Sequence, residues 1–154
     1  MSENHSRNPQ GFDHFEFPRS LARGIRDAGF TRPRPIQDAA IPAALEGRDV
    51  LGLAQTGTGK TAAFALPLLD QMLDDPYRAV RALVLAPTRE LASQIAAEIR
   101  LLARHTDVKV ALIYGGVSQQ KQVDQLRRRP EIVVGCPGRV LDLVEQRLLR
   151  LDEV

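Results

Sequence analysis

Residues 54–61, with the sequence AQTGTGKT, constrain this chain more than any other stretch. Residues 49–53 before them are typical of a buried parallel strand, and residues 62–73 after them are apolar and compatible with a helix. A strand, a glycine-rich turn and a helix in this order indicate a phosphate-binding loop. The glycines let backbone N–H groups close around phosphate oxygens, and the helix points its positive end at them. The usual pattern is G-x-x-x-x-G-K-S/T, and Ala54 replaces its first glycine while the cradle itself is kept.

The side chains of this phosphate loop have different expected roles. Lys60 would reach the β- and γ-phosphates of a nucleotide, and the Thr61 hydroxyl would ligate Mg²⁺. The other residues would cradle the phosphates: Gln55, Thr56, Gly57, Thr58 and Gly59. The alternative is a glycine-rich turn with an exposed lysine, and the flanking strand and helix argue against it.

Length and composition indicate a single globular domain. The chain has 154 residues, of which 44% are hydrophobic and 26% are charged, and its net charge is +2. The single cysteine, Cys136, excludes an internal disulfide framework and is typical of a reducing compartment. The polar N-terminus has no apolar signal core, and no run approaches the ~20 apolar residues of a membrane span. We therefore expect a cytoplasmic protein with a disordered tail over residues 1–11.

Strand-like and helix-like segments alternate from residue 49 onward. Strands are expected at residues 49–53, 80–86, 108–114 and 131–135, each a short apolar run rich in β-branched residues. Helices are expected at residues 18–28, 35–45, 60–73, 88–104, 118–128 and 138–148. This alternation predicts an α/β fold with a mostly parallel sheet and helices on both faces.

Five motifs, in order and at the right spacing, resemble those of one helicase family. Residues 29–37 resemble a Q motif, with the aromatic Phe12 upstream of it. The others are the phosphate loop, motif Ia at residues 87–92 (PTRELA), the doublet Gly115 and Gly116, and motif Ib at residues 136–139 (CPGR). On these residues, the chain from residue 12 to 154 resembles the N-terminal RecA-like half of a DEAD-box ATP-dependent RNA helicase. The resemblance implies a RecA-like P-loop NTPase fold that uses ATP and Mg²⁺.

The Q motif implies recognition of adenine. Adenine presents an N6 donor beside an N7 acceptor, and one glutamine amide satisfies both. The resemblance therefore implies that Gln37 reads the base, that Phe12 stacks on it, and that Arg32 also binds the nucleotide. The alternatives are that Gln37 only begins a helix, and that Phe12 only anchors the core, as Phe15 or Phe17 would.

The three later motifs each follow a predicted strand, and the carboxyl ends of parallel strands share one edge of a sheet. They offer a hydroxyl, arginines, glycines and helix N-termini, which suit a sugar–phosphate backbone rather than base edges. The resemblance implies sequence-independent RNA binding by Pro87, Thr88, Arg89, Gly115, Gly116, Pro137, Gly138 and Arg139. Ordinary turns between strands and helices are the alternative for any one loop.

Two positions depart from the family pattern, in which threonine is usual at both. Cys136 removes an expected hydroxyl contact to phosphate, and Arg34 replaces a threonine that takes part in local hydrogen bonding of the Q motif. Residues 127–129, three consecutive arginines, are interpreted as a solvated helix end, where cations favour the dipole.

The acidic Asp-Glu-Ala-Asp motif of the family is not found. Asp152 and Glu153 follow residues 147–150, which do not form a buried strand pattern. We therefore expect a RecA-like domain that is incomplete at its C-terminus, with a second RecA-like domain in the full-length protein. Such a chain should bind nucleotide without efficient hydrolysis. The open alternatives are a P-loop ATPase or kinase for a substrate other than nucleic acid, and a non-catalytic nucleotide-binding fragment.

Overall fold

Three short parallel strands form the sheet in the computed structural model of the chain, which describes residues 11–75 and 77–154. They are β1 (Ala82–Leu85), β2 (Val110–Ile113) and β3 (Ile132–Gly135), in the order β1-β3-β2. In this register Val133 of β3 lies opposite Leu83 of β1 and Ala111 of β2. The strands predicted at residues 80–86, 108–114 and 131–135 are confirmed with narrower bounds. The predicted tail over residues 1–11 falls outside the described residues, apart from Gly11.

The predicted helices are also confirmed, with small shifts at their ends. They are α1 (Arg19–Asp27), α2 (Pro35–Leu45), α3 (Lys60–Asp74), α4 (Arg89–Leu102), α5 (Gln119–Arg127) and α6 (Pro137–Glu145), and a short 3-10 helix, η1 (Phe12–Phe15), precedes them. Within the described ranges, none of these helices is both long and apolar enough to cross a membrane.

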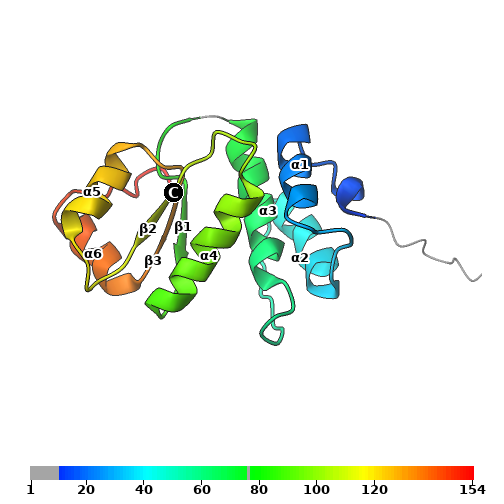
Figure 1. Cartoon of the computed structure of the whole chain (residues 1–154), viewed down its shortest axis with the longest axis horizontal. Coiled ribbons are helices and arrows are strands. Elements are labelled where there is room, and N and C mark those ends of the chain that lie inside the picture. The colour runs from blue at the N-terminus through cyan, green and yellow to red at the C-terminus, as the bar shows by residue number, and fades with distance from the viewer. Residues whose placement is uncertain (1–10, 76) are drawn as a thin grey trace, which may run out of the picture.

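Helices cover both faces of the sheet, as the alternation predicts. α4 lies on one face with α3 beyond it, and α5 and α6 lie on the other face (Figure 1). Ile132 and Val134 of β3 belong to the core that α3 and α4 complete, whereas Val133 between them belongs to the core beneath α6. Successive side chains of a strand leave opposite faces, so the central strand joins two hydrophobic cores. The α/β fold class is confirmed.

Local signals set the ends of several helices. α1 ends just before Gly29, whose φ of 83° is the left-handed conformation that glycine adopts without strain. α2 begins at Pro35, where the missing N–H of proline costs nothing. Thr88 caps α4, because its hydroxyl oxygen accepts a hydrogen bond from the Leu91 N–H at 3.2 Å.

Residues 49–53 do not form a strand, so this prediction is wrong. The described residues contain no strand that pairs with them. Leu51 is 87% exposed and Leu53 is 85% exposed, so the apolar pattern is not buried either. The physical reason is that hydrogen bonds to a neighbouring strand define a strand, and an apolar run cannot supply them alone. The phosphate loop therefore follows a segment without regular structure.

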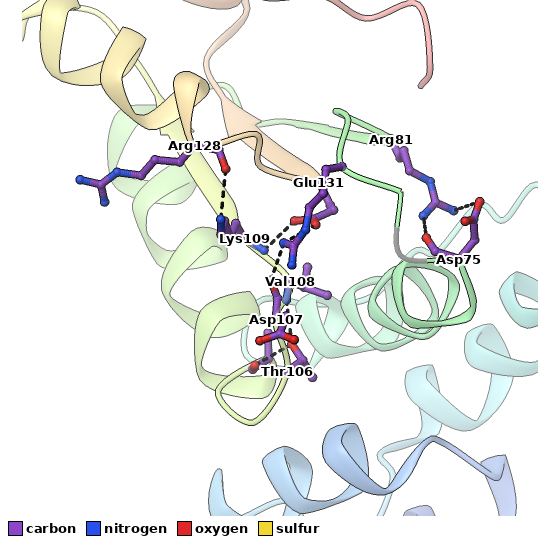
Figure 2. A network of polar contacts seen from close by, with 10 residues as sticks. Asp75, Arg81, Thr106, Asp107, Val108, Lys109, Arg128 and Glu131 are labelled. Carbon is purple, nitrogen blue, oxygen red and sulfur yellow. Dashed lines mark hydrogen bonds and ion pairs between the residues drawn. The ribbon is translucent and has the colours of Figure 1, made fainter.

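A buried carboxylate ties together the amino ends of the strands (Figure 2). Glu131 is 3% exposed and accepts hydrogen bonds from the Arg78 guanidinium and the Lys109 backbone N–H, both at 2.8 Å. The Lys109 ammonium group donates to the Arg128 carbonyl at 3.2 Å. Because Lys109 precedes β2 and Glu131 precedes β3, this network fixes the edge of the sheet opposite the predicted ligand loops.

Candidate functional site

The phosphate loop opens onto a pocket of about 790 Å³. That size lies within the roughly 300–1,000 Å³ of small-molecule sites. Three parts of the chain line it: residues 28–37, the phosphate loop, and one face of α4. The residues predicted to bind nucleotide that line it are Arg32, Gln37, Thr56, Gly57, Gly59, Lys60 and Thr61. Folding thus brings the Q motif and the phosphate loop to a single cavity.

Two glycines give the phosphate loop its shape. Gly57 and Gly59 have φ values of 80° and 89°, which residues with a Cβ adopt only at a cost. α3 begins at Lys60, directly after Gly59, and no side chain caps this helix start. Backbone N–H groups at such a helix start favour an anion, and the helix dipole adds to this preference.

Other side chains brace the loop from within. The Thr58 hydroxyl donates to the Gln55 carbonyl at 2.7 Å, and the Lys60 ammonium group donates to the Ala54 carbonyl. Gln55 and Thr58 are not among the described residues that line the pocket. Their observed contacts stabilise the turn, whereas Lys60 lies at the pocket wall and is exposed.

Gln37 is fully buried and joins α2 to the phosphate loop. Its side-chain oxygen accepts from the Arg34 backbone N–H at 2.8 Å, and its side-chain nitrogen donates to the Gly59 carbonyl at 3.1 Å. A Cβ at position 59 would lie 2.5 Å from that nitrogen, so the approach requires glycine. A glutamine amide has two N–H donors and two acceptor sites. One donor and one acceptor site of Gln37 are left after these bonds. Gln37 can therefore support the start of α2 and still be free to bond to a base.

Arg34 contacts the phosphate loop, which sequence reasoning did not foresee. Its guanidinium donates to the Gly57 carbonyl, and its Cδ lies 3.2 Å from the position of a Cβ on Gly59. The side chain also lines the pocket. The departure from threonine at this position was visible in the sequence, but the reach of the longer side chain to residue 57 was not.

Glu98 is a second residue of the pocket that sequence reasoning missed. It projects from α4 on the same face as Leu91 and Ile95, which also line the cavity. Burial raises the pKa of the Glu98 carboxyl, while the nearby Thr61 hydroxyl, the Ala62 backbone and the charge of Arg34 act to lower it. A carboxylate therefore faces the start of α3. The helical periodicity of α4 could have predicted that Glu98 faces the pocket, because position 98 lies on the same face as positions 91 and 95.

Phe12 lies outside this pocket. It is 6% exposed, and its ring meets that of Phe30 at a centroid distance of 6.0 Å in an edge-to-face arrangement. It lines a neighbouring cavity of about 450 Å³, and Phe30 and Thr31 contribute to both cavities. The structure therefore places Phe12 in an aromatic cluster with Phe15, as the core-anchor alternative expects. Stacking of Phe12 on a base stays a prediction.

The residues predicted to contact RNA gather at the carboxyl edge of the sheet. Residues 87–89 follow β1, Gly115 and Gly116 follow β2, and residues 137–139 follow β3. Because the three strands are parallel, these segments share one edge. Figure 1 shows the segment between α2 and α3, which carries the phosphate loop, at the same end of the molecule as the start of α4.

Neighbouring side chains contact Arg89 and Arg139, the two arginines predicted to bind RNA at this edge. The Arg89 guanidinium carbon lies 5.4 Å from the centroid of the Tyr114 ring. The Arg139 guanidinium donates to the Gln122 side-chain oxygen at 3.4 Å and lies 3.7 Å from the Asp142 carboxylate. Tyr114 and Gln122 were not singled out in the sequence, because no motif marks them.

Cys136 and the acidic pair at residues 152–153 have different surroundings. The Cys136 side chain packs against the core, and its backbone N–H already donates to the Ile113 carbonyl at 2.9 Å. Asp152 and Glu153 lie in an exposed turn and line a different pocket, together with Tyr77 and Arg78. They are not among the residues that line the nucleotide pocket.

The fold and the phosphate loop together define a RecA-like P-loop domain. The chain belongs to the DEAD/DEAH box helicase family, whose model matches residues 34–154. The ATP-dependent RNA helicase CshA of Listeria monocytogenes is 44% identical over 143 residues, which are 93% of this chain and 27% of that protein. The DEAD-box ATP-dependent RNA helicase RhpA of Helicobacter pylori is 47% identical over 131 residues, 85% of this chain and 26% of that protein.

Solved structures agree with this assignment. The RNA helicase Prp28 from Chaetomium thermophilum, bound to ADP, matches with a TM-score of 0.85 and 44% identity over 95% of this chain and 37% of that one. A hypothetical ATP-dependent RNA helicase from Sulfolobus tokodaii matches with a TM-score of 0.77 and 39% identity over 84% of this chain and 37% of that one. The chain thus spans about a quarter of the length of the curated relatives it matches.

Proposed function

We propose that this chain is the ATP-binding part of an ATP-dependent RNA helicase that remodels RNA duplexes in the cytoplasm. The observation that carries the proposal is the shared pocket, whose wall contains Gln37 of α2 together with Lys60 and Thr61 at the start of α3. The Gln37 amide would match an adenine base, Lys60 would match the phosphates, and the Thr61 hydroxyl would match a metal ion. Membership of the DEAD/DEAH box family supports the same activity.

The residues of the pocket fit ATP with Mg²⁺. The phosphates would lie against the glycine-rich turn at Gly57 and Gly59 and the N–H groups that begin α3. Lys60 would neutralise phosphate charge and Thr61 would ligate Mg²⁺. In proteins this ion uses few protein oxygens, with phosphates and water as its other ligands. The described residues contain no cluster of three or more His, Cys, Asp or Glu side chains, which is compatible with an ion held mainly by the nucleotide.

The RNA would lie along the carboxyl edge of the sheet. Arg89 and Arg139 are cations at that edge, and the starts of α4 and α6 add backbone N–H groups. Such groups bind sugar and phosphate rather than bases, so binding should be independent of sequence and sensitive to salt. In the complete helicase, a second RecA-like domain would face this edge.

This chain alone should turn over little ATP. Phosphoryl transfer depends on positioned charges around the γ-phosphate and the attacking water. Among the described residues of the pocket, the acidic side chain is Glu98, whose carboxyl is on α4 and not on a strand. We expect nucleotide binding without efficient hydrolysis and without duplex unwinding. A phosphate-release assay with and without single-stranded RNA tests this, and RNA-stimulated hydrolysis by the 154-residue chain would contradict it.

Substitution of Lys60 tests the proposal directly. A hydrogen bond to a charged group contributes about 1.5–3 kcal/mol, so Lys60→Ala should weaken ATP–Mg²⁺ binding by roughly 10- to 150-fold. Lys60 is exposed, so the circular dichroism spectrum should not change, and the melting temperature should fall at most slightly through loss of the bond to the Ala54 carbonyl. Isothermal titration calorimetry measures the affinity, and Lys121→Ala, which removes an exposed lysine on α5, is the matched control. Equal affinities of the Lys60 variant and the unmodified chain would exclude the phosphate-loop assignment.

A further inference from the structure

Tyr114 connects two of the three loops at the carboxyl edge of the sheet. It follows β2 and directly precedes Gly115 and Gly116, so it belongs to the second loop by position. Its ring contacts the guanidinium of Arg89, in the first loop, at 5.4 Å from the ring centroid. A guanidinium within about 6 Å of an aromatic centroid is attracted to the face of the ring. Tyr114 therefore restricts the positions that the exposed Arg89 side chain can adopt.

Gln122 connects the second loop to the third. Its side-chain nitrogen donates to the Tyr114 carbonyl at 2.7 Å, and its side-chain oxygen accepts from the Arg139 guanidinium at 3.4 Å. Arg139 also donates to the Val117 carbonyl at 3.5 Å. Gln122 is only 2% exposed although it is polar and lies on the mostly polar α5, where Val123 is also buried. A buried amide is costly unless both of its ends are bonded, and here both ends bond to this edge.

We propose that Tyr114 and Gln122 are positioning residues for RNA binding, which hold Arg89 and Arg139 in place for the sugar–phosphate backbone. The inference rests on the proposed RNA-binding role of this edge and adds two residues to it. Neither residue needs to touch the RNA. Tyr114 orders Arg89 through its ring, and Gln122 orders Arg139 while fixing the backbone of Tyr114. The two arginines, which belong to different helices, are thereby preorganised at the carboxyl edge, where Arg139 also pairs with the Asp142 carboxylate at 3.7 Å.

Binding of a fluorescein-labelled polyuridine to the 154-residue chain, followed by fluorescence anisotropy at several salt concentrations, tests the role of Tyr114. Tyr114→Leu keeps the apolar bulk but removes the aromatic face. An exposed cation–π contact corresponds to about a two- to five-fold change in affinity, so we expect a loss of that size. If Arg89 no longer reaches a phosphate, the slope of log K against log salt should also fall by up to about 0.7.

Three further variants serve as controls for Tyr114. Tyr114→Phe keeps the ring and should bind RNA like the unmodified chain. Tyr77→Ala removes an exposed tyrosine that lines a different pocket, and it should have no effect. In an Arg89→Ala background, Tyr114→Leu should cause no additional loss, because a positioning residue has no effect without the group that it positions. A merely structural role would lower the affinity in both backgrounds.

The same double-variant design applies to Gln122. Gln122→Met fills a similar volume without polar atoms, so it should weaken RNA binding in the unmodified chain. Because Gln122 also bonds to the Tyr114 carbonyl, the loss should shrink in an Arg139→Ala background and disappear only when Arg89 and Arg139 are both replaced by alanine. Nucleotide affinity, measured in parallel, should not change in any of these variants. If Arg89→Ala weakens RNA binding while Tyr114→Leu and Gln122→Met do not, the positioning role of Tyr114 and Gln122 is wrong, but the carboxyl edge still binds RNA. If the unmodified chain binds no RNA at low salt, the positioning role and the proposed RNA-binding edge are both wrong.

Discussion

Two segments of this molecule have similar apolar sequences, but one is a buried strand and the other is exposed and has no regular structure. Residues 132–134 of β3 are 0% exposed, whereas Leu51 and Leu53 of residues 49–53 are 87% and 85% exposed. β3 has a parallel neighbour on each side, and residues 49–53 have none in the described part of the chain. A strand is therefore a property of the sheet rather than of the segment. An apolar run indicates that a segment can be a strand, but the neighbour decides whether it is one.

The largest expected effect comes from truncating apolar side chains in the two segments. Ile132→Ala leaves a cavity between the sheet and its helices and should lower the free energy of unfolding by about 2–5 kcal/mol. Leu53→Ala should change it by no more than about 0.5 kcal/mol, because the side chain is already in solvent. Urea denaturation of both variants measures the difference. A loss above ~1.5 kcal/mol in Leu53→Ala would show that residues 49–53 are buried in solution.

Gln37 sharpens the comparison, because it lies on α2 and holds the phosphate loop by a side-chain hydrogen bond instead of by a sheet. If the amide reads adenine, the unmodified chain should prefer ATP to GTP, since a bidentate amide–adenine contact corresponds to about 1–3 kcal/mol of discrimination. Gln37→Ala should remove most of that preference. Competition of both nucleotides against a fluorescent ADP analogue measures it, and Gln120→Ala on α5 is the control.

Gln37→Ala should also lower stability, because the variant loses the bonds to Arg34 and Gly59. The ratio of the ATP and GTP affinities separates the two effects, since a purely structural defect weakens both nucleotides alike. Equal affinities of ATP and GTP for the unmodified chain would exclude Gln37 as the base reader.

Substitution of Arg34, which contacts the same phosphate loop, should have a smaller effect on ATP affinity. Arg34→Thr restores the residue usual in the family and removes the guanidinium bond to the Gly57 carbonyl. Because this bond is exposed and acts on ATP only through the loop, we expect a contribution of about 0.5–1.5 kcal/mol, and ATP affinity should fall by roughly two- to twelve-fold. Arg48→Thr, a change of an exposed arginine paired with Glu46, is the matched control for net charge. An unchanged or tighter ATP affinity in Arg34→Thr would mean that the contact does not support the loop.

The same contrast explains what could be predicted from the sequence. Lys60, Thr61 and the two loop glycines occupy one contiguous motif, whose geometry follows from local backbone preferences. Gln37 was identified through the resemblance, and its burial against Gly59 agrees with a role at this pocket. These elements depend on few distant contacts, so the sequence is informative about them.

The features that the sequence did not predict depend on contacts between distant elements. Glu98 reaches the pocket because α4 packs near α3, and Tyr114 meets Arg89 because β1 and β2 end at the same edge. Phe12 has several equivalent apolar partners, so its position was not determined by its spacing from the Q motif. Such placements require the packing of the whole domain, which no single stretch contains.

The smallest expected effect concerns the pairing of α1 with the end of α4. His105 lies 2.6 Å from the Asp27 carboxylate, and this hydrogen bond is the main cause that lowers the pKa of Asp27 below its ordinary value of 3.8. A carboxyl with a lowered pKa stabilises the fold above the unfolded-state pKa, and the stabilisation is lost as the pH falls through the folded-state value. The melting temperature of Asp27→Asn should therefore lie slightly below that of the unmodified chain at pH 5–7, and the two should converge below about pH 4. Thermal unfolding from pH 3 to pH 7 measures this, with Asp49→Asn, a change of another exposed carboxylate, as the control. A difference that stays constant over this range would show that Asp27 acts through packing and not through its charge.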